Sequence, residues 1–258
     1  MTISRILSTA GFLLGLATAA QAQTAPGATS KVIMPGSEHG STMAPVMDNS
    51  LYFHALLDQF EGRVGGGQDG FKWEGQAWAG TDYDKVWLKS EGFALGKGGV
   101  EDGRHELLYD RALTTYLDLQ AGVRTDWDSS TGRSWAALGV QGLAPLFFDY
   151  EATTYLSDSG HAALRLAASY DLLITQRLIL QPEIEMNFYS KADPGRAVGA
   201  GLSDIDAGLR LRYEISRKFA PYVGVAYSGK FGQTADFARK EGDAATAVQF
   251  VFGIRTWF

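Results

Sequence analysis

The chain contains no cysteine among its 258 residues. This absence excludes disulfide bonds, thiolate metal sites and cysteine nucleophiles together. Any sulfur ligand for a soft metal ion must therefore come from one of the five methionines.

An excess of basic residues is also missing. Lys and Arg together number 23 against 29 Asp and Glu, which gives a net charge of −6 at pH 7. Proteins that bind nucleic acid usually carry a basic surface, so the composition argues against a nucleic-acid partner.

Long apolar runs are absent after the first twenty residues, so we expect no transmembrane helix in the rest of the chain. The opening stretch, "MTISRILSTAGFLLGLATAAQA", combines the positive charge of Arg5, a short apolar segment and an A-x-A site ending at Ala22. This pattern is typical of a secretory signal peptide. We therefore predict a signal peptide at residues 1–22 and an exported protein.

The composition and residue pattern of the sequence change near residue 50. Residues 23–49 are rich in Pro, Gly, Ser and Thr and show no period, which predicts a flexible tail. From residue 50 to residue 258, short alternating segments are separated by Gly, Asp, Ser and Pro clusters, as expected for an all-β chain. In "LILQPEIEMNFY", for example, Leu180 and Ile184 share one face while Gln181 and Glu183 share the other.

Two architectures can use such strands. A soluble sandwich or barrel buries the apolar face, whereas a transmembrane barrel turns that face towards lipid and the polar face towards its lumen. Strands of about ten residues, aromatic residues near strand ends and alternating short and long connections favour the membrane barrel. We predict an all-β, transmembrane antiparallel β-barrel of about 12 strands with a flexible N-terminal periplasmic tail. The last long connection, residues 229–245, is expected to be an extracellular loop.

Catalysis inside such a barrel would need a nucleophile close to a histidine. The chain has four histidines, His39, His54, His105 and His161, and none lies in a recognisable hydrolase motif. No G-x-S-x-G segment is present. We therefore expect a protein that is not an enzyme.

The tail holds a group of soft metal ligands. Met34, His39, Met43 and Met47 lie close together in sequence. Thioether sulfur selects Cu(I), and imidazole accepts copper in either oxidation state. His54, on the first strand, is a fifth candidate, although the pattern leaves its face ambiguous. The alternative is that these residues occur in the tail by chance.

The polar faces of the later strands carry charges of both signs. A hairpin between the relevant strands would bring Glu183 roughly opposite Arg210 or Arg212. Such charges either pair to fill a narrow lumen or form a track that passes ions. Inward acids and bases occur in similar numbers, so we expect a mostly closed, charge-paired lumen with copper selected at its periplasmic mouth.

Several stretches resemble one known family closely. They include "LLDQFEGR" at 56–63, "GTDYDKVWLKSEG" at 80–92, "LLYDRALTTYLDLQAGVRTDW" at 107–127, "GLSDIDAGLRLRYEISRKFAPYVGV" at 201–225 and the terminal "GIRTWF". The chain resembles the outer-membrane copper resistance protein B family over essentially the whole predicted barrel. The resemblance implies a role in copper resistance alongside periplasmic copper carriers and multicopper oxidases.

One feature departs from the resemblance. Family members commonly carry a longer tract with repeated Met, His and Asp, whereas this chain has only "MPGSEHGSTMAPVMDNS". A single copper site, preferring Cu(I) to Cu(II), is therefore expected. The predicted contacts are copper ions, outer-membrane lipid and a periplasmic copper carrier or multicopper oxidase. The alternative function is a general or substrate-specific porin-like channel without a specific copper site.

Overall fold

A computed structural model describes residues 50–67, 69–96, 100–127 and 132–258, with only the backbone of residues 101 and 102. The predicted signal peptide and tail lie outside the described residues. The described elements are β1 (Tyr52–Val64), β2 (Gly70–Gly80), β3 (Asp84–Leu95), β4 (Val100–Thr114), β5 (Leu117–Asp126), β6 (Arg133–Ala144), β7 (Phe148–Ser157), β8 (Ala162–Tyr170), β9 (Leu172–Leu173), β10 (Leu178–Tyr189), η2 (Pro194–Arg196), β11 (Gly201–Tyr213), β12 (Phe219–Lys230), α2 (Gly232–Glu241) and β13 (Thr246–Trp257).

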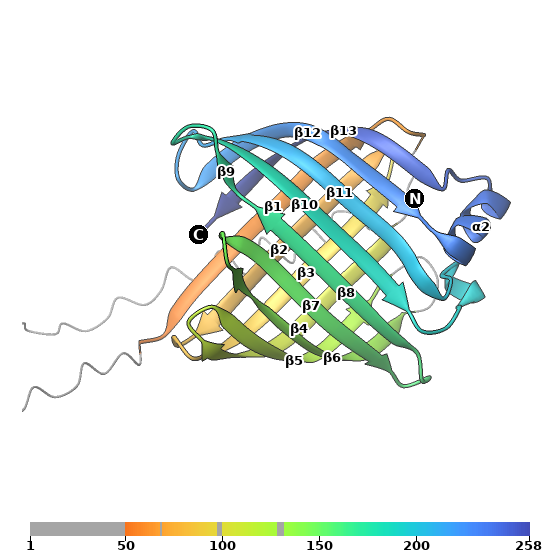
Figure 1. Ribbon diagram of the computed structural model, residues 1–258, viewed down its shortest axis with the longest axis horizontal. Coiled ribbons are helices and arrows are strands. Elements are labelled where there is room, and N and C mark those ends of the chain that lie inside the picture. The colour runs from red at the N-terminus through yellow and green to blue at the C-terminus, as the bar shows by residue number, and fades with distance from the viewer. Residues whose placement is uncertain (1–49, 68, 97–99, 128–131) are drawn as a thin grey trace, which may run out of the picture. The chain divides into compact units, whose positions relative to one another are not determined.

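The strands form one closed antiparallel barrel (Figure 1). From β1 to β8 and from β10 to β13 each strand pairs with the next, β10 also pairs with β8 and β9, and β13 returns to pair with β1. The barrel therefore has twelve main strands, which confirms the predicted architecture. Most strands have 10–15 residues, a length that suits a tilted membrane span.

The two-residue strand β9 continues β8 after a short interruption. Glu183 pairs with Ser169 on β8, and Leu180 pairs with Leu172 on β9, so the register is the same on both sides. That register places Pro182 opposite Tyr170. Proline has no backbone N–H to donate, so the ladder is interrupted at this point.

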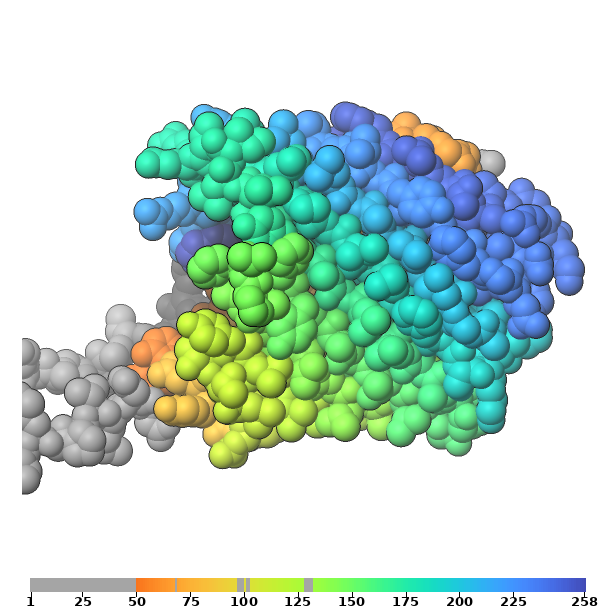
Figure 2. Space-filling model, viewed as in Figure 1, coloured from red at the N-terminus to blue at the C-terminus, as the bar shows by residue number. Residues whose placement is uncertain are grey.

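The distribution of side chains is the reverse of that in a water-soluble protein. Charged side chains are buried inside, while large apolar side chains are exposed on the outer wall. Exposed apolar residues on the strands include Val86, Leu107, Val123, Leu138, Leu156, Leu209, Val223, Val225, Phe250 and Phe252. Figure 2 shows the part of this wall formed by β6 to β12. An apolar exterior around a polar interior is the arrangement of a transmembrane β-barrel.

The connections differ at the two ends of the barrel. Short turns lie at the end where β1 begins and β13 ends, whereas α2 lies at the opposite end (Figure 1). The long connection predicted over residues 229–245 contains a helix that the sequence analysis did not foresee, because residues 232–241 form α2. Gly242 ends the helix with φ of 88°, a conformation that glycine adopts without a Cβ penalty. No helix among the described residues is long and apolar enough to cross a membrane.

Candidate functional site in the barrel interior

Alternation along β11 directs its charged side chains into the lumen. Arg210 and Arg212 are each 2 % exposed, whereas their neighbours Leu209 and Leu211 are 42 % and 36 % exposed. Successive residues of a strand point to opposite faces, so one face of β11 is apolar and the other carries charged residues of both signs, Asp206, Arg210 and Arg212. A charge buried in this way needs partners, and the other strands supply them.

Arg210 is the centre of one cluster of polar side chains. Its Nε donates to Glu61 Oε2 and its Nη2 donates to Glu61 Oε1, both at 2.9 Å. The same guanidinium donates to Gln59 Oε1 at 2.9 Å and to Glu183 Oε2 at 3.0 Å. Tyr222 Oη donates to Glu61 Oε2 at 3.0 Å. Arg210 therefore links β1, β10 and β11 from inside the barrel.

The sequence placed Glu183 roughly opposite Arg210 or Arg212, and the structure refines that placement. The backbone partner of Glu183 is Gly208, and the backbone partner of Arg210 is Gln181. Glu183 and Arg210 meet diagonally through their side chains instead. Long side chains commonly reach a diagonal neighbour in this way.

Eight charged side chains form a layer across the middle of the lumen, which we call the belt. Its members are Lys72, Lys89, Glu91, Arg104, Glu151, Arg165, Glu185 and Asp206. Arg104 Nη1 lies 3.5 Å from Glu185 Oε1, although four strands separate β4 from β10 in the sheet. Four strands likewise separate β8 from β3, yet Arg165 Nη2 lies 3.4 Å from Glu91 Oε2. These contacts therefore cross the lumen.

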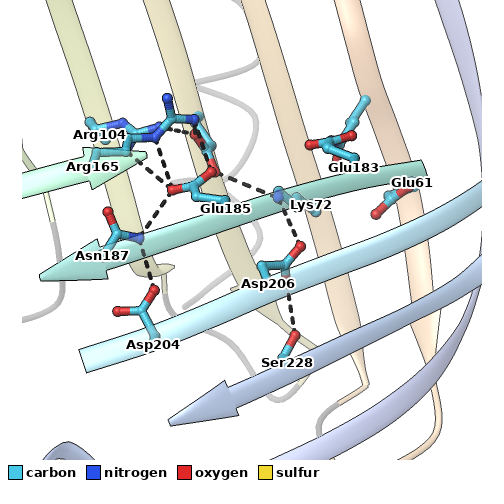
Figure 3. A network of polar contacts seen from close by, with 12 residues as sticks. Glu61, Lys72, Arg104, Arg165, Glu183, Glu185, Asn187, Asp204, Asp206 and Ser228 are labelled. Carbon is cyan, nitrogen blue, oxygen red and sulfur yellow. Dashed lines mark hydrogen bonds and ion pairs between the residues drawn. The ribbon is translucent and has the colours of Figure 1, made fainter. Parts of the chain in front are cut away.

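Figure 3 shows how the belt converges on Glu185 and Asp206. Arg165 donates to the two oxygens of Glu185 at 2.9 and 2.8 Å. Lys72 Nζ lies 3.5 Å from Asp206 Oδ1 and 3.6 Å from Glu91 Oε1. Bidentate pairs of arginine with carboxylate are among the stronger hydrogen-bonded contacts, so the belt is a well-connected layer of side chains.

A second group of contacts lies at the end of the barrel that carries the long connections. Asp126 accepts hydrogen bonds from Arg124 Nε at 2.6 Å, Trp135 Nε1 at 2.8 Å and Arg196 Nη1 at 3.0 Å. Arg196 belongs to η2 in the connection between β10 and β11, and Asp193 of that connection pairs with Arg133 at 2.7 Å. The connection is thus tied to β5 and β6 by ion pairs.

Aromatic side chains gather at the opposite end of the barrel, where β1 begins. The ring of His54 lies 5.6 Å from that of Trp257 and 6.0 Å from that of Trp78, and Trp78 lies 6.1 Å from Trp87. A register shift between Leu57 and Gln59 changes which residues of β1 face inward. Before the shift, His54 pairs with Trp78, which lies on the same face of β2 as the buried Lys72, so His54 faces the lumen.

Of the five predicted copper ligands, the structure describes only His54. Met34, His39, Met43 and Met47 lie outside the described residues, so the structure does not test whether they meet. Within the described ranges, no group of three or more His, Asp or Glu side chains is arranged to hold a metal ion.

The sequence analysis missed several buried charges of the lumen, namely Glu61, Arg63 and Glu106. An alternating pattern like that of β11 was also present in β4. Its inward-facing residues lie at every second position and are Arg104, Glu106, Leu108 and Asp110. In β1 the register shift displaced the pattern, so Gln59, Glu61 and Arg63 were less easily read.

The closed barrel, with its apolar wall and charged lumen, places the chain in the class of outer-membrane β-barrel proteins. A solved structure titled "NanC porin structure in rhombohedral crystal form" has a similar fold, with a TM-score of 0.50 and 12 % identity. The similarity covers 80 % of this chain and 99 % of that one. At this identity the likeness concerns the fold alone.

Sequence similarity identifies the family to which the chain belongs. Residues 51–258 match the family described as "Copper resistance protein B precursor (CopB)". Copper resistance protein B of Escherichia coli is 46 % identical and the copper resistance protein B homolog of Pseudomonas syringae pv. tomato is 41 % identical. Each alignment covers 83 % of this chain and 72 % of the relative. The chain belongs to the copper resistance protein B family, which supports a role in copper resistance.

Proposed function

We propose that the protein binds copper at the periplasmic side of the outer membrane and supports its export or its sequestration at the cell envelope. The observation that carries this proposal is the family membership over nearly the whole described chain. The proposed role is non-catalytic, and copper is the cargo.

The proposed ligands are Met34, Met43, Met47, His39 and His54. Thioether and imidazole donors together favour Cu(I) over Cu(II). In support, His54 faces the lumen at the end of the barrel where the chain enters β1. Short turns mark the periplasmic end of outer-membrane barrels, so the tail and His54 would share the periplasmic side.

The proposed partners follow from this placement. A periplasmic copper carrier or a multicopper oxidase could exchange copper with the tail, and outer-membrane lipid would surround the apolar wall. The net charge of −6 makes nucleic acid an unsuitable partner.

A general porin-like channel is the less favoured function. A porin needs an open lumen, whereas the belt crosses this lumen with contacts such as Arg104–Glu185 and Arg165–Glu91. Twelve strands also enclose a narrow space that long side chains can fill.

A competition assay with the full-length protein tests the copper site. Wild-type protein should remove Cu(I) from a chromogenic chelator, and replacing Met34, Met43 and Met47 by Leu should abolish this competition. Leucine keeps the size and apolar character of methionine but lacks its sulfur donor. His54→Asn should weaken Cu(I) binding, whereas His161→Asn, on the distant β7–β8 turn, should not. Equal competition by the triple leucine variant and the wild type would rule out this site.

A further inference from the structure

A small cavity lies at the belt, in the middle of the lumen. Its volume is about 50 Å³. Five carboxylates line it, namely Asp58, Glu74, Glu91, Glu106 and Glu151. A cavity needs roughly 10–15 Å³ of such volume to hold one water molecule, so this one has room for a small ion and at least one water.

Two of these carboxylates direct unused oxygen atoms to buried positions. Glu106 is 2 % exposed, and its Oε1 accepts a hydrogen bond from Tyr155 Oη at 2.7 Å, but its Oε2 has no hydrogen-bond partner. Glu74 Oε2 is likewise buried without a hydrogen-bond partner. Buried polar atoms are nearly always satisfied, so two orphaned acceptors beside one cavity point to a missing positive or donating group.

The neighbours of Glu74 explain why the protein itself does not satisfy that oxygen. On the two adjacent strands, Glu74 lies beside Gln59 and Glu91. Glu91 is already engaged by Arg104 and Arg165, and the amide of Gln59 donates to Glu183. The nearby donors are therefore committed elsewhere.

The charges around the cavity do not balance. Five carboxylates face three cations, Lys89, Arg104 and Arg165, which leaves an excess of two negative charges. Outside the cavity, Arg255 pairs with Asp58 and Lys72 lies near Glu91, whereas Glu185 draws on both Arg104 and Arg165.

We propose that this cavity binds one small divalent cation between Glu74 and Glu106. Carboxylate oxygens suit divalent ions that prefer oxygen ligands. No three acidic or histidine side chains of the described residues form a complete metal site, so the ion keeps part of its hydration shell. The site uses different donors from the Met and His tail and takes a harder ion than Cu(I).

Mn²⁺ is a suitable probe because it prefers oxygen ligands and its free form is measured directly by electron paramagnetic resonance. Metal-free full-length protein in detergent should bind one Mn²⁺ through this site and should unfold at a higher temperature when Mn²⁺ is present. Glu74→Gln and Glu106→Gln should each weaken Mn²⁺ binding at least tenfold and remove the rise in Tm. Asp118→Asn is the matched control, since Asp118 lies near Lys85 in the lumen but does not line the cavity.

Folding of the variants can be checked separately. Glu74→Gln removes an unbalanced charge, so its Tm without Mn²⁺ should equal or exceed that of the wild type. The variant with Met34, Met43 and Met47 replaced by Leu should bind Mn²⁺ normally, which separates this site from the proposed Cu(I) site. An absence of Mn²⁺ binding by the wild type, or unchanged binding by both glutamine variants, would overturn the proposal.

Discussion

Arg210 shows how a single residue can stabilise the interior of this barrel. Its planar guanidinium reaches Glu61, Glu183 and Gln59 at once, which a lysine could not do with the same geometry. Gly253 provides space beside this cluster, since a Cβ there would lie 2.7 Å from Tyr222 Oη and 2.8 Å from Glu61 Cβ. The absence of a side chain at Gly253 thus lets Tyr222 reach Glu61.

Arg210→Leu should destabilise the barrel strongly. The change leaves Glu61 and Glu183 without their shared cation, and breaking a buried ion pair typically costs about 3–5 kcal/mol. The free energy of unfolding can be measured by urea titration of the protein folded into lipid vesicles. Arg239→Leu is the control, because the Arg239–Asp236 pair on α2 is exposed and should contribute little. Equal effects of the two changes would contradict the role given to Arg210.

At the scale of the strand, neighbouring residues experience opposite environments. Leu209 faces outward and Arg210 faces inward, so moving a charge by one position transfers it from lumen to lipid. Leu209→Arg should cost about 2–4 kcal/mol if the residue lies near the bilayer midplane. The same urea titration in vesicles measures this cost.

Leu146→Arg is a suitable comparison for Leu209→Arg. Leu146 is also an exposed leucine, but it lies in the turn between β6 and β7, outside the strands. An arginine there can remain in water, so unfolding should change little. A similar loss of stability in both variants would indicate that the outer face of β11 does not contact lipid.

Sequence reasoning identified the strands and most of their faces because alternation of apolar and charged residues is a local signal. It did not identify the face of His54, since the register shift after Leu57 reverses the alternation within β1. It also missed α2, whose ten residues lie between two strand segments and were read as loop. The sequence could not predict the ion pair between Arg104 and Glu185, because only closure of the whole sheet brings their two strands face to face.

At the scale of the whole molecule, side-chain contacts cross the lumen at two levels. The belt crosses its middle, and the connection carrying η2 is tied to β5 and β6 by Arg196 and Arg133. In planar bilayers the wild type should therefore show little conductance. Large, steady and weakly selective currents from the wild type would show that the lumen is open.

Replacing both Arg104 and Arg165 by Ala should raise the conductance. The change removes the two long side chains that cross the lumen and leaves Glu91, Glu106 and Glu185 without these cations. The new current should therefore favour cations. A double change of Arg239 and Lys240 to Ala on α2, away from the belt, should leave the conductance at the wild-type level. No gain from the first variant would argue that another part of the molecule closes the path.

The barrel closes where β1 pairs antiparallel with β13, and this pairing constrains whether the number of strands is even or odd. Leu56 pairs with Trp257 and Val64 pairs with Phe250, so segments 186 to 201 positions apart in the chain must find each other. Because neighbours run in opposite directions, β12 runs the same way as β1. Loss of β13 would therefore leave an odd number of strands whose outer two are parallel, and the antiparallel ladder could not close. A barrel that closes only through antiparallel pairs therefore loses or gains its strands two at a time, as hairpins.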